Sequence, residues 1–309
     1  MPDWPRPPGV SSTFYKAHGL GNDYLVFEEG DAWLASPVAI RRVCDRYRGV
    51  GADGIVVLLA DRTDGVFRLR MFNPDGSEFE RSGNGLRIFG SYLARLARAG
   101  AHVGNPPYTV QVGGNHVTLD LHGRSGAVHD VSADMGRART GPGAIGLDPA
   151  ALDPDGFMAG PNGERLHVVP VSVGNPHLVV LVDAPTDEAL VRIGPFLATH
   201  AALAAGANVQ LAAAGGRGGQ ECRALIWERG VGRTSASGTS SCAVAVAAVT
   251  SGLAVPGALK VRMPGGDLVV DVSADLDVVL RGPVEEICTG SLTDGWLERV
   301  RRSAARSSD

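Results

Sequence analysis

Two short stretches of the chain place serine and glycine directly before an apolar segment. The first is Ser82-Gly83-Asn84-Gly85-Leu86-Arg87, and the second is Ser237-Gly238-Thr239-Ser240-Ser241. Each pattern is typical of a helix start, where backbone N–H groups lack helical partners and the helix dipole is positive. Two such starts facing one cleft would bind an anion such as a carboxylate or a phosphate.

The two serines add a specific chemistry to such a site. If a carboxylate is bound there, its α-carbon lies between Ser82 and Ser237. One side chain could then remove a proton from one face of that carbon, and the other could return a proton to the opposite face. The simpler interpretation, which composition and spacing alone favour, is that both serines are only N-caps.

Two helices must position these serines. The first is indicated by apolar residues at helical spacing and ends near Gly100; these residues are Leu86, Phe89, Leu93 and Leu96. The second follows Ser237, ends near Gly252 and is apolar almost all round over residues 242–247. A helix of that kind must be enclosed on every side.

The two halves of the chain repeat one order of elements. A strand interrupted by a Gly-Asn turn comes first, at residues 18–23 and again at 174–177, and each half ends with a Ser-Gly helix start. We therefore predict an α/β (α+β) fold of two similar domains, each a curved sheet or barrel wrapped around one central apolar helix. The first domain would span 12–130 plus 277–302 and the second 131–276, with flexible tails at 1–11 and 303–309. Short strands are expected at 67–72, 108–112, 128–135, 167–173 and 278–281, with 136–163 connecting the halves.

Composition excludes several classes of function. The chain of 309 residues is 44% hydrophobic, carries a net charge of -4 and has no basic block, which argues against nucleic acid as a partner. No apolar run is long enough to cross a bilayer, so no membrane association is expected. The N-terminus does not resemble a signal peptide, and the four cysteines form no CxxC pair, which together predict a cytoplasmic protein with reduced thiols. The absence of HExxH or zinc-like Cys/His spacing predicts no metal.

Several motifs, taken in order, resemble the diaminopimelate epimerase family over nearly the whole chain. They are His18-Gly19-Leu20-Gly21-Asn22-Asp23-Tyr24, Gly49-Val50-Gly51-Ala52-Asp53-Gly54, Phe72-Asn73-Pro74-Asp75-Gly76-Ser77-Glu78, the Ser82 motif, Gly174-Asn175-Pro176-His177, and Glu228-Arg229-Gly230 leading to Ser237. The resemblance implies two pseudo-symmetric domains with the site between them. It also implies a cofactor-free, two-base epimerisation at the α-carbon of an amino acid. It allows a homodimer, for which no surface pattern in the sequence gives evidence.

The resemblance also assigns roles in binding a small amino-acid substrate. Residues matching those that hold the distal carboxylate are Asn73, Asn175, Asn208 and Arg229. Glu228 matches the residue that contacts the distal amine, and Asn22 matches one that lines the pocket. The backbone amides matching those that hold the α-carboxylate belong to Gly83, Asn84, Gly238 and Thr239. These positions imply diaminopimelate or a similar long polar amino acid.

The chain departs from the family pattern at both base positions. The family has cysteines there, and this chain has Ser82 and Ser237. A serine hydroxyl is a far weaker acid than a thiol and needs a neighbouring base. The first candidate for that base is His177, which the family places near the second position, and Glu80 is the weaker one. A further departure is Arg233, where the family commonly has Glu, which would alter the charge beside Ser237.

Three functions therefore stay open at the level of the sequence. The first is a pyridoxal-phosphate-independent epimerase or racemase with Ser82, Ser237 and His177 as catalytic residues. The second is a related lyase, such as an amino-acid dehydratase, in which a leaving group departs from the next carbon. The third is a non-catalytic ligand-binding homologue, and serines introduced deliberately to trap a ligand are a further case. A serine hydrolase is disfavoured because no Gly-x-Ser-x-Gly surrounds either serine.

Overall fold

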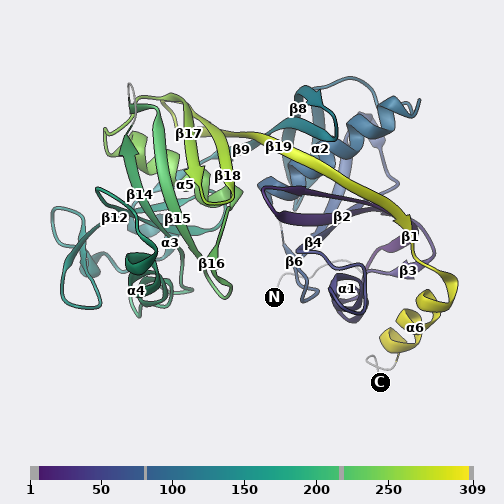
Figure 1. Ribbon diagram of the computed structural model, residues 1–309, viewed down its shortest axis with the longest axis horizontal. Helices are drawn as coiled ribbons and strands as arrows, with labels where there is room; N and C mark the ends of the chain where they lie inside the picture. The colour runs from purple at the N-terminus through teal and green to yellow at the C-terminus, as the bar shows by residue number, and fades with distance from the viewer. Residues whose placement is uncertain (1–6, 80–81, 216–218, 306–309) are drawn as a thin grey trace. The chain divides into compact units, whose positions relative to one another are not determined.

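The chain folds into two units of mixed α/β architecture, shown in Figure 1 as a computed structural model that describes residues 7–79, 82–215 and 219–305. The first unit combines the chain up to Ala133 with the segment from Pro283 onward, and the second is Asp134–Gly282. The chain passes from one unit to the other within β9 (Val128–Arg137) and returns within β19 (Asp277–Ser291).

Strands of the first unit close into a barrel around one helix. The strand order is β1, β2, β4, β5, β7, β8, β9 and β19, and β19 pairs back with β1. Helix α2 (Gly83–Arg98) contacts β1, β2, β4 and β8. An added Cβ at Gly90 would lie 2.7 Å from the Val131 side chain of β9, so the helix lies directly against the barrel wall. The other bounds are β1 Gly9–Gly19, β2 Asn22–Glu29, β3 Trp33–Leu34, β4 Gly54–Leu58, η1 Thr63–Gly65, β5 Phe67–Phe72, β6 Glu78–Phe79, β7 Tyr108–Val112 and β8 Asn115–Ser125.

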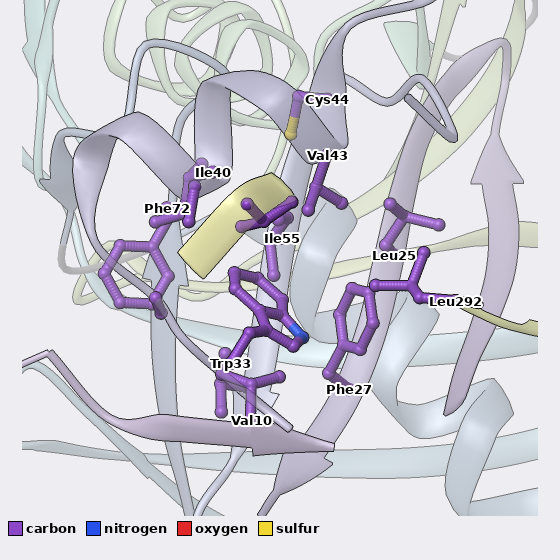
Figure 2. Packing of buried hydrophobic residues seen from close by; sticks show 14 of the residues in the cluster. Val10, Leu25, Phe27, Trp33, Ile40, Val43, Cys44, Ile55, Phe72 and Leu292 are labelled. Atoms are coloured by element: carbon purple, nitrogen blue, oxygen red, sulfur yellow. The ribbon is translucent and has the colours of Figure 1, made fainter. Parts of the chain in front are cut away.

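A second apolar layer covers the outside of this barrel. Strands β2 and β4 are parallel neighbours that are buried on both faces, which explains their continuous apolar runs. Their outward side chains, including Phe27 and Ile55, join a core cluster with α1 (Pro37–Cys44) and α6 (Asp294–Ala305), part of which Figure 2 shows. Phe27 and Trp33 pack edge to face at its centre, with ring centroids 5.3 Å apart.

The N-terminal strand begins earlier than the sequence predicts. Strand β1 starts at Gly9, inside the expected tail of residues 1–11, and α6 continues to Ala305, inside the expected tail of 303–309. The cause at the N-terminal end is Val10, whose side chain is fully buried in the cluster beside Trp33. An isolated valine among serines and prolines gives no periodicity, so the sequence did not reveal this strand.

The second unit repeats the plan around an apolar helix. Its strands pair in the order β12, β13, β14, β15, β17, β18 and β19, with β10 and β11 on β12 and β16 on β15. Helix α5 (Gly238–Thr250) contacts most of these strands, and its residues 240–248 are all buried. The prediction of two similar domains, each wrapping strands around one apolar helix, is confirmed. No helix within the described ranges is long and apolar enough to cross a membrane. The strand bounds are β10 Arg139–Thr140, β11 Phe157–Ala159, β12 Arg165–Ser172, β13 Pro176–Leu181, β14 Asn208–Gly215, β15 Glu221–Glu228, β16 Gly232–Thr234, β17 Gly257–Met263 and β18 Gly266–Val272.

The segment expected to be a connection, 136–163, contains short elements of its own. Beside β10 and β11 it holds α3 (Pro142–Ile145) and the 3-10 turn η2 (Pro149–Ala151). Residues of this segment, such as Ile145 and Met158, pack with α4 (Asp187–Ala198) in a second core cluster. The segment is therefore part of the core of the second unit.

Strand β19 is much longer than the predicted strand at 278–281. It pairs with β18 through Arg281 and with β1 from Glu285 onward. Pro283, which has no N–H to donate, falls in the gap between these two partners, so the strand continues through it without losing a ladder hydrogen bond on that edge.

Candidate active site

Helix α2 begins at a serine whose side chain caps it. The backbone of Ser82 is extended (φ −133°, ψ 117°), and its Oγ accepts a hydrogen bond of 3.0 Å from the backbone N–H of Gly85. Gly83 and Asn84, the first two residues of the helix, are buried. Ser82 is thus an N-cap, as in the simpler interpretation of the two serines.

The Asn84 side chain fixes the neighbouring Asn22 from behind this helix start. Its Nδ2 donates to both the backbone carbonyl and the side-chain Oδ1 of Asn22, each at 2.7 Å. Arg87, which is 1% exposed, donates from Nη2 to the Oδ1 of Asn84 at 2.9 Å. A guanidinium can only donate, so this bond decides which way the Asn84 amide faces.

A charged cluster fixes the other side of Asn22. Its Nδ2 donates to Oδ2 of Asp53 at 3.2 Å, and Arg46 bridges Asp53 and Asp23. Burial by itself raises the pKa of Asp23, but hydrogen bonds from Arg46 and Lys16 outweigh it and hold the pKa at about 2. With one Nδ2 hydrogen donated to Asp53, Asn22 has a second Nδ2 hydrogen that it can donate to a ligand.

Asn73 lies on the same rim of the barrel. It follows the last residue of β5, and its Nδ2 donates to Oγ of Ser77 at 3.0 Å within its own turn. The end of β5 pairs with the start of β4, which is parallel to β2. Asn73 therefore lies two strand spacings, roughly 10 Å, from β2 at about the level of Tyr24, two residues along the strand from Asn22.

Helix α5 begins at the second serine, which behaves differently. Ser237 is the N-cap by backbone conformation (φ −152°, ψ 131°), yet within the described residues its hydroxyl makes no capping hydrogen bond. Ser237, Gly238 and Thr239 are all partly exposed. A hydroxyl that is not used as a cap is available to a ligand, so the two serines are chemically unequal.

Three strand ends gather the other predicted residues of the second unit. Asn175 precedes β13, Asn208 begins β14, and Glu228 ends β15, with Glu228 followed by the exposed Arg229. Asn208 holds these ends together, because its Nδ2 donates to the carbonyl of Pro176 at 3.3 Å and its Oδ1 accepts from the backbone N–H of Arg229 at 3.0 Å. The guanidinium of Arg229 donates to the carbonyl of Ala205.

His177 is placed differently from the expectation that it activates Ser237. The side chain is fully buried, and its ring nitrogens face Asn175 Oδ1 at 2.9 Å and Gln210 Nε2 at 3.1 Å. Burial lowers the pKa of His177 to about 3; the hydrogen bond with Gln210 opposes this shift in part, and the Arg229 charge adds to it. The imidazole is therefore neutral and engaged at both nitrogens. The sequence could not reveal this, because the facing side chain comes from a different strand.

Two other charged residues were singled out near the serines. Arg233 is exposed, and its Nε donates to Oδ1 of Asp187, the first residue of α4, at 2.7 Å. The Asp187 carboxylate offsets the positive charge that Arg233 was expected to bring near Ser237. Glu80 lies outside the described residues.

The cysteines do not replace the serines. Cys242 is fully buried in α5. Burial raises the pKa of Cys44 to about 12 and that of Cys222 to about 11, so both stay protonated at neutral pH. Cys288 is exposed on β19.

Four supporting residues were not singled out from the sequence. They are Asp53, Arg87, Gln210 and Ser240, each within one or two hydrogen bonds of a predicted site residue. A signal existed for two of them, since Arg87 stands inside the apolar face of a helix and Gln210 inside an apolar strand. Polar side chains in such positions need buried partners.

Comparison with known proteins gives one consistent family. The family model described as diaminopimelate epimerase matches residues 14–141 and 169–287. The diaminopimelate epimerase of Desulforudis audaxviator is 38% identical over 283 residues, which cover 90% of this chain and 98% of that protein. Diaminopimelate epimerase 2 of Nostoc sp. is 34% identical and covers 91% and 95% of the two chains.

Solved structures share the fold at lower identity. A predicted epimerase from Pseudomonas aeruginosa superposes with a TM-score of 0.60 at 22% identity, covering 91% of this chain and 99% of that chain. A hydroxyproline epimerase from Agrobacterium vitis gives a TM-score of 0.62 at 15% identity, covering 94% and 98%. At these identities the likeness establishes the fold alone.

Proposed function

Because this chain belongs to the diaminopimelate epimerase family, and is therefore an isomerase of the kind that works without pyridoxal phosphate, we propose that it inverts the α-carbon of diaminopimelate or a similar long amino acid with a distal carboxylate. The observation that carries the proposal is the set of side-chain amides held at strand ends by hydrogen bonds. Asn22 and Asn208 are each fixed by two or more partners, and Asn175 is fixed by His177.

The helix starts support the binding of the α-carboxylate. Helices α2 and α5 begin with Gly83 and Gly238, so the residue that supplies the first N–H group has no side chain of its own in either helix. A carboxylate binding there gains hydrogen bonds from N–H groups that lack helical partners and a favourable interaction with the dipole. The same N–H groups stabilise the negative charge that the carboxylate acquires when the α-proton leaves.

The proposed proton transfer uses the two serines in turn. One serine, as the alkoxide, takes the α-proton; the C–H electron pair is delocalised into the carboxylate, and the other serine's hydroxyl gives its proton to the opposite face. The two serines thus exchange protonation states in each turnover. Since a hydroxyl is a weaker acid than a thiol and His177 is engaged elsewhere, we expect slow turnover.

Solvent isotope exchange tests the proposal. The protein is incubated with LL- or meso-diaminopimelate in D₂O, with the α-proton followed by NMR and the stereoisomers by chiral chromatography. We expect loss of the α-proton signal together with interconversion of the isomers, and loss of inversion in Ser82→Ala and in Ser237→Ala. Neither exchange nor inversion with the unaltered protein would refute the proposed reaction.

A further inference from the structure

A buried chain of hydrogen bonds runs from the first turn of α5 to Asn175. Gln210 Nε2 lies 3.0 Å from Ser240 Oγ and 3.1 Å from His177 Nδ1, and His177 Nε2 lies 2.9 Å from Asn175 Oδ1. Ser240, Gln210 and His177 are all 0% exposed, whereas Asn175 is partly exposed. The chain therefore connects a fully enclosed interior to one residue that a ligand can reach.

The direction of each hydrogen bond follows from the donors available. The Gln210 amide nitrogen has two hydrogens and no acceptor capacity, so it donates to Ser240 and to His177 Nδ1. An imidazole that accepts at Nδ1 and is neutral carries its hydrogen on Nε2. That Nε2–H then donates to Asn175 Oδ1, which leaves the Asn175 Nδ2 hydrogens for the ligand.

The opposite orientation of the Gln210 amide is less favourable. It would direct Oε1 toward His177 and Ser240 and place the NH₂ group where Oε1 now lies. That position is buried and offers no hydrogen-bond partner among the described residues. Two orphaned N–H donors cost more than one under-satisfied carbonyl oxygen, which folded proteins tolerate more often. The reversed chain would also require Asn175 to turn its Oδ1 toward the ligand.

We propose that Gln210 is a positioning residue that sets the tautomer of His177 and thereby makes Asn175 a hydrogen-bond donor toward the ligand. The consequence is that the position contacted by Asn175 favours a carboxylate, which accepts hydrogen bonds, over an ammonium group, which needs an acceptor. This second clause rests on the proposed function, because it takes Asn175 as a substrate contact. The tautomer is a property of the unliganded protein and does not depend on that function.

The test reads the His177 ring directly in protein labelled with ¹⁵N-histidine. His177 signals are assigned with His177→Asn, and at pH 7 the unaltered protein should show a neutral ring protonated at Nε2. Gln210→Met, which removes the amide at similar size, should shift the ring toward a mixture of tautomers. Its preference for diaminopimelate over lysine, measured as the ratio of binding constants, should fall about tenfold, as expected for losing one hydrogen bond to a charged group.

Neighbouring serines give a matched pair if Gln210→Met does not fold. Ser240→Ala removes the acceptor that holds the Gln210 amide, whereas Ser241→Ala removes an equally buried hydroxyl that donates to the Gly238 carbonyl within α5. Only Ser240→Ala should alter the His177 signals. A ring protonated at Nδ1 or at both nitrogens in the unaltered protein, or signals that Gln210→Met and Ser240→Ala both leave in place, would overturn the assignment. The expected tautomer in a protein that does not bind diaminopimelate would uphold the role of Gln210 and refute the proposed function alone.

Discussion

Gly19 shows how closely the backbone approaches the buried amides of the first unit. An added Cβ would lie 2.0 Å from Oδ1 of Asn84, a side chain that Asn22 and Arg87 hold in place. We expect Gly19→Ala to destabilise the fold by about 1–3 kcal/mol, as overpacking does, and to raise KM more than it lowers kcat. Urea unfolding and steady-state kinetics check both effects. Gly123→Ala, at a strand glycine with no atom within 4 Å of the added Cβ, is the control and should change neither.

The carboxylate of Asp23 makes the free energy of unfolding depend on pH in the acidic range. Its pKa in the folded protein, about 2, is below the ordinary value of 3.8, so its contribution is complete above about pH 4 and is lost as pH falls toward 2. The contribution is on the order of 2 kcal/mol. We expect Asp23→Asn to be less stable by that amount at pH 7 and to approach the unaltered protein near pH 2. Asp31→Asn, at an exposed carboxylate, is the control and should leave stability unchanged. If Asp23→Asn were as stable as the unaltered protein at pH 7, this role of Asp23 would be contradicted.

The acidity of the two hydroxyls should limit turnover. Replacing both Ser82 and Ser237 with Cys supplies groups that ionise much nearer neutral pH, especially at helix starts. We expect kcat for diaminopimelate to rise at least about 100-fold, within the range that general acid–base catalysis contributes. Chiral chromatography of the product measures the gain. An unchanged or lower rate would show that proton transfer at these positions is not limiting.

At this scale the proposed ligand-binding residues were easier to predict from the sequence than the side chains that hold them. Asn22 and Asn175 stand in Gly-Asn turns, and Asn208 was named through the family resemblance, so all three could be named in advance. The partners of these residues could not, because a hydrogen bond such as that between Gln210 and His177 joins residues 33 positions apart. Nor could the sequence reveal that His177 is enclosed and neutral, since that follows from what packs around it.

At the scale of elements, α2 and α5 should respond differently to loss of their serines. Ser82 Oγ accepts the Gly85 N–H, whereas Ser237 makes no such bond among the described residues. We expect Ser82→Ala to lose about 1 kcal/mol of unfolding free energy, the usual value of an N-cap, and Ser237→Ala to lose clearly less. Thermal unfolding of the two variants measures the difference. Equal losses would mean that both serines cap, or that neither does.

Elements with strong local signals were predicted well, and those shaped by tertiary pairing were not. The strand Phe67–Phe72 and the helix that begins after Ser82 match the prediction, because alternation and helical spacing mark them clearly. Strand β19 was predicted far too short, because the sequence does not show that it exchanges β18 for β1 as a partner and also pairs with β9.

At the scale of the whole molecule, the second unit is one continuous segment with its own core. Its apolar cluster draws only on residues between Ala144 and Trp227, all inside Asp134–Gly282. We expect residues 134–282 expressed alone to unfold cooperatively in urea and to keep the ¹⁵N signals of His177 seen in the full chain. A gradual, non-cooperative transition would contradict this independence.

Because the chain returns to the first unit at Pro283, the two units can complete their sheets at different times during synthesis. The strand that closes the first barrel, β19, pairs with β1 but is translated only after all of the second unit. On the ribosome, the second unit can complete its sheet while the first still has an open edge at β1. Unpaired edges invite mispairing and aggregation. In nascent chains halted before residue 283, the first unit should therefore need protection by chaperones more than the second unit does.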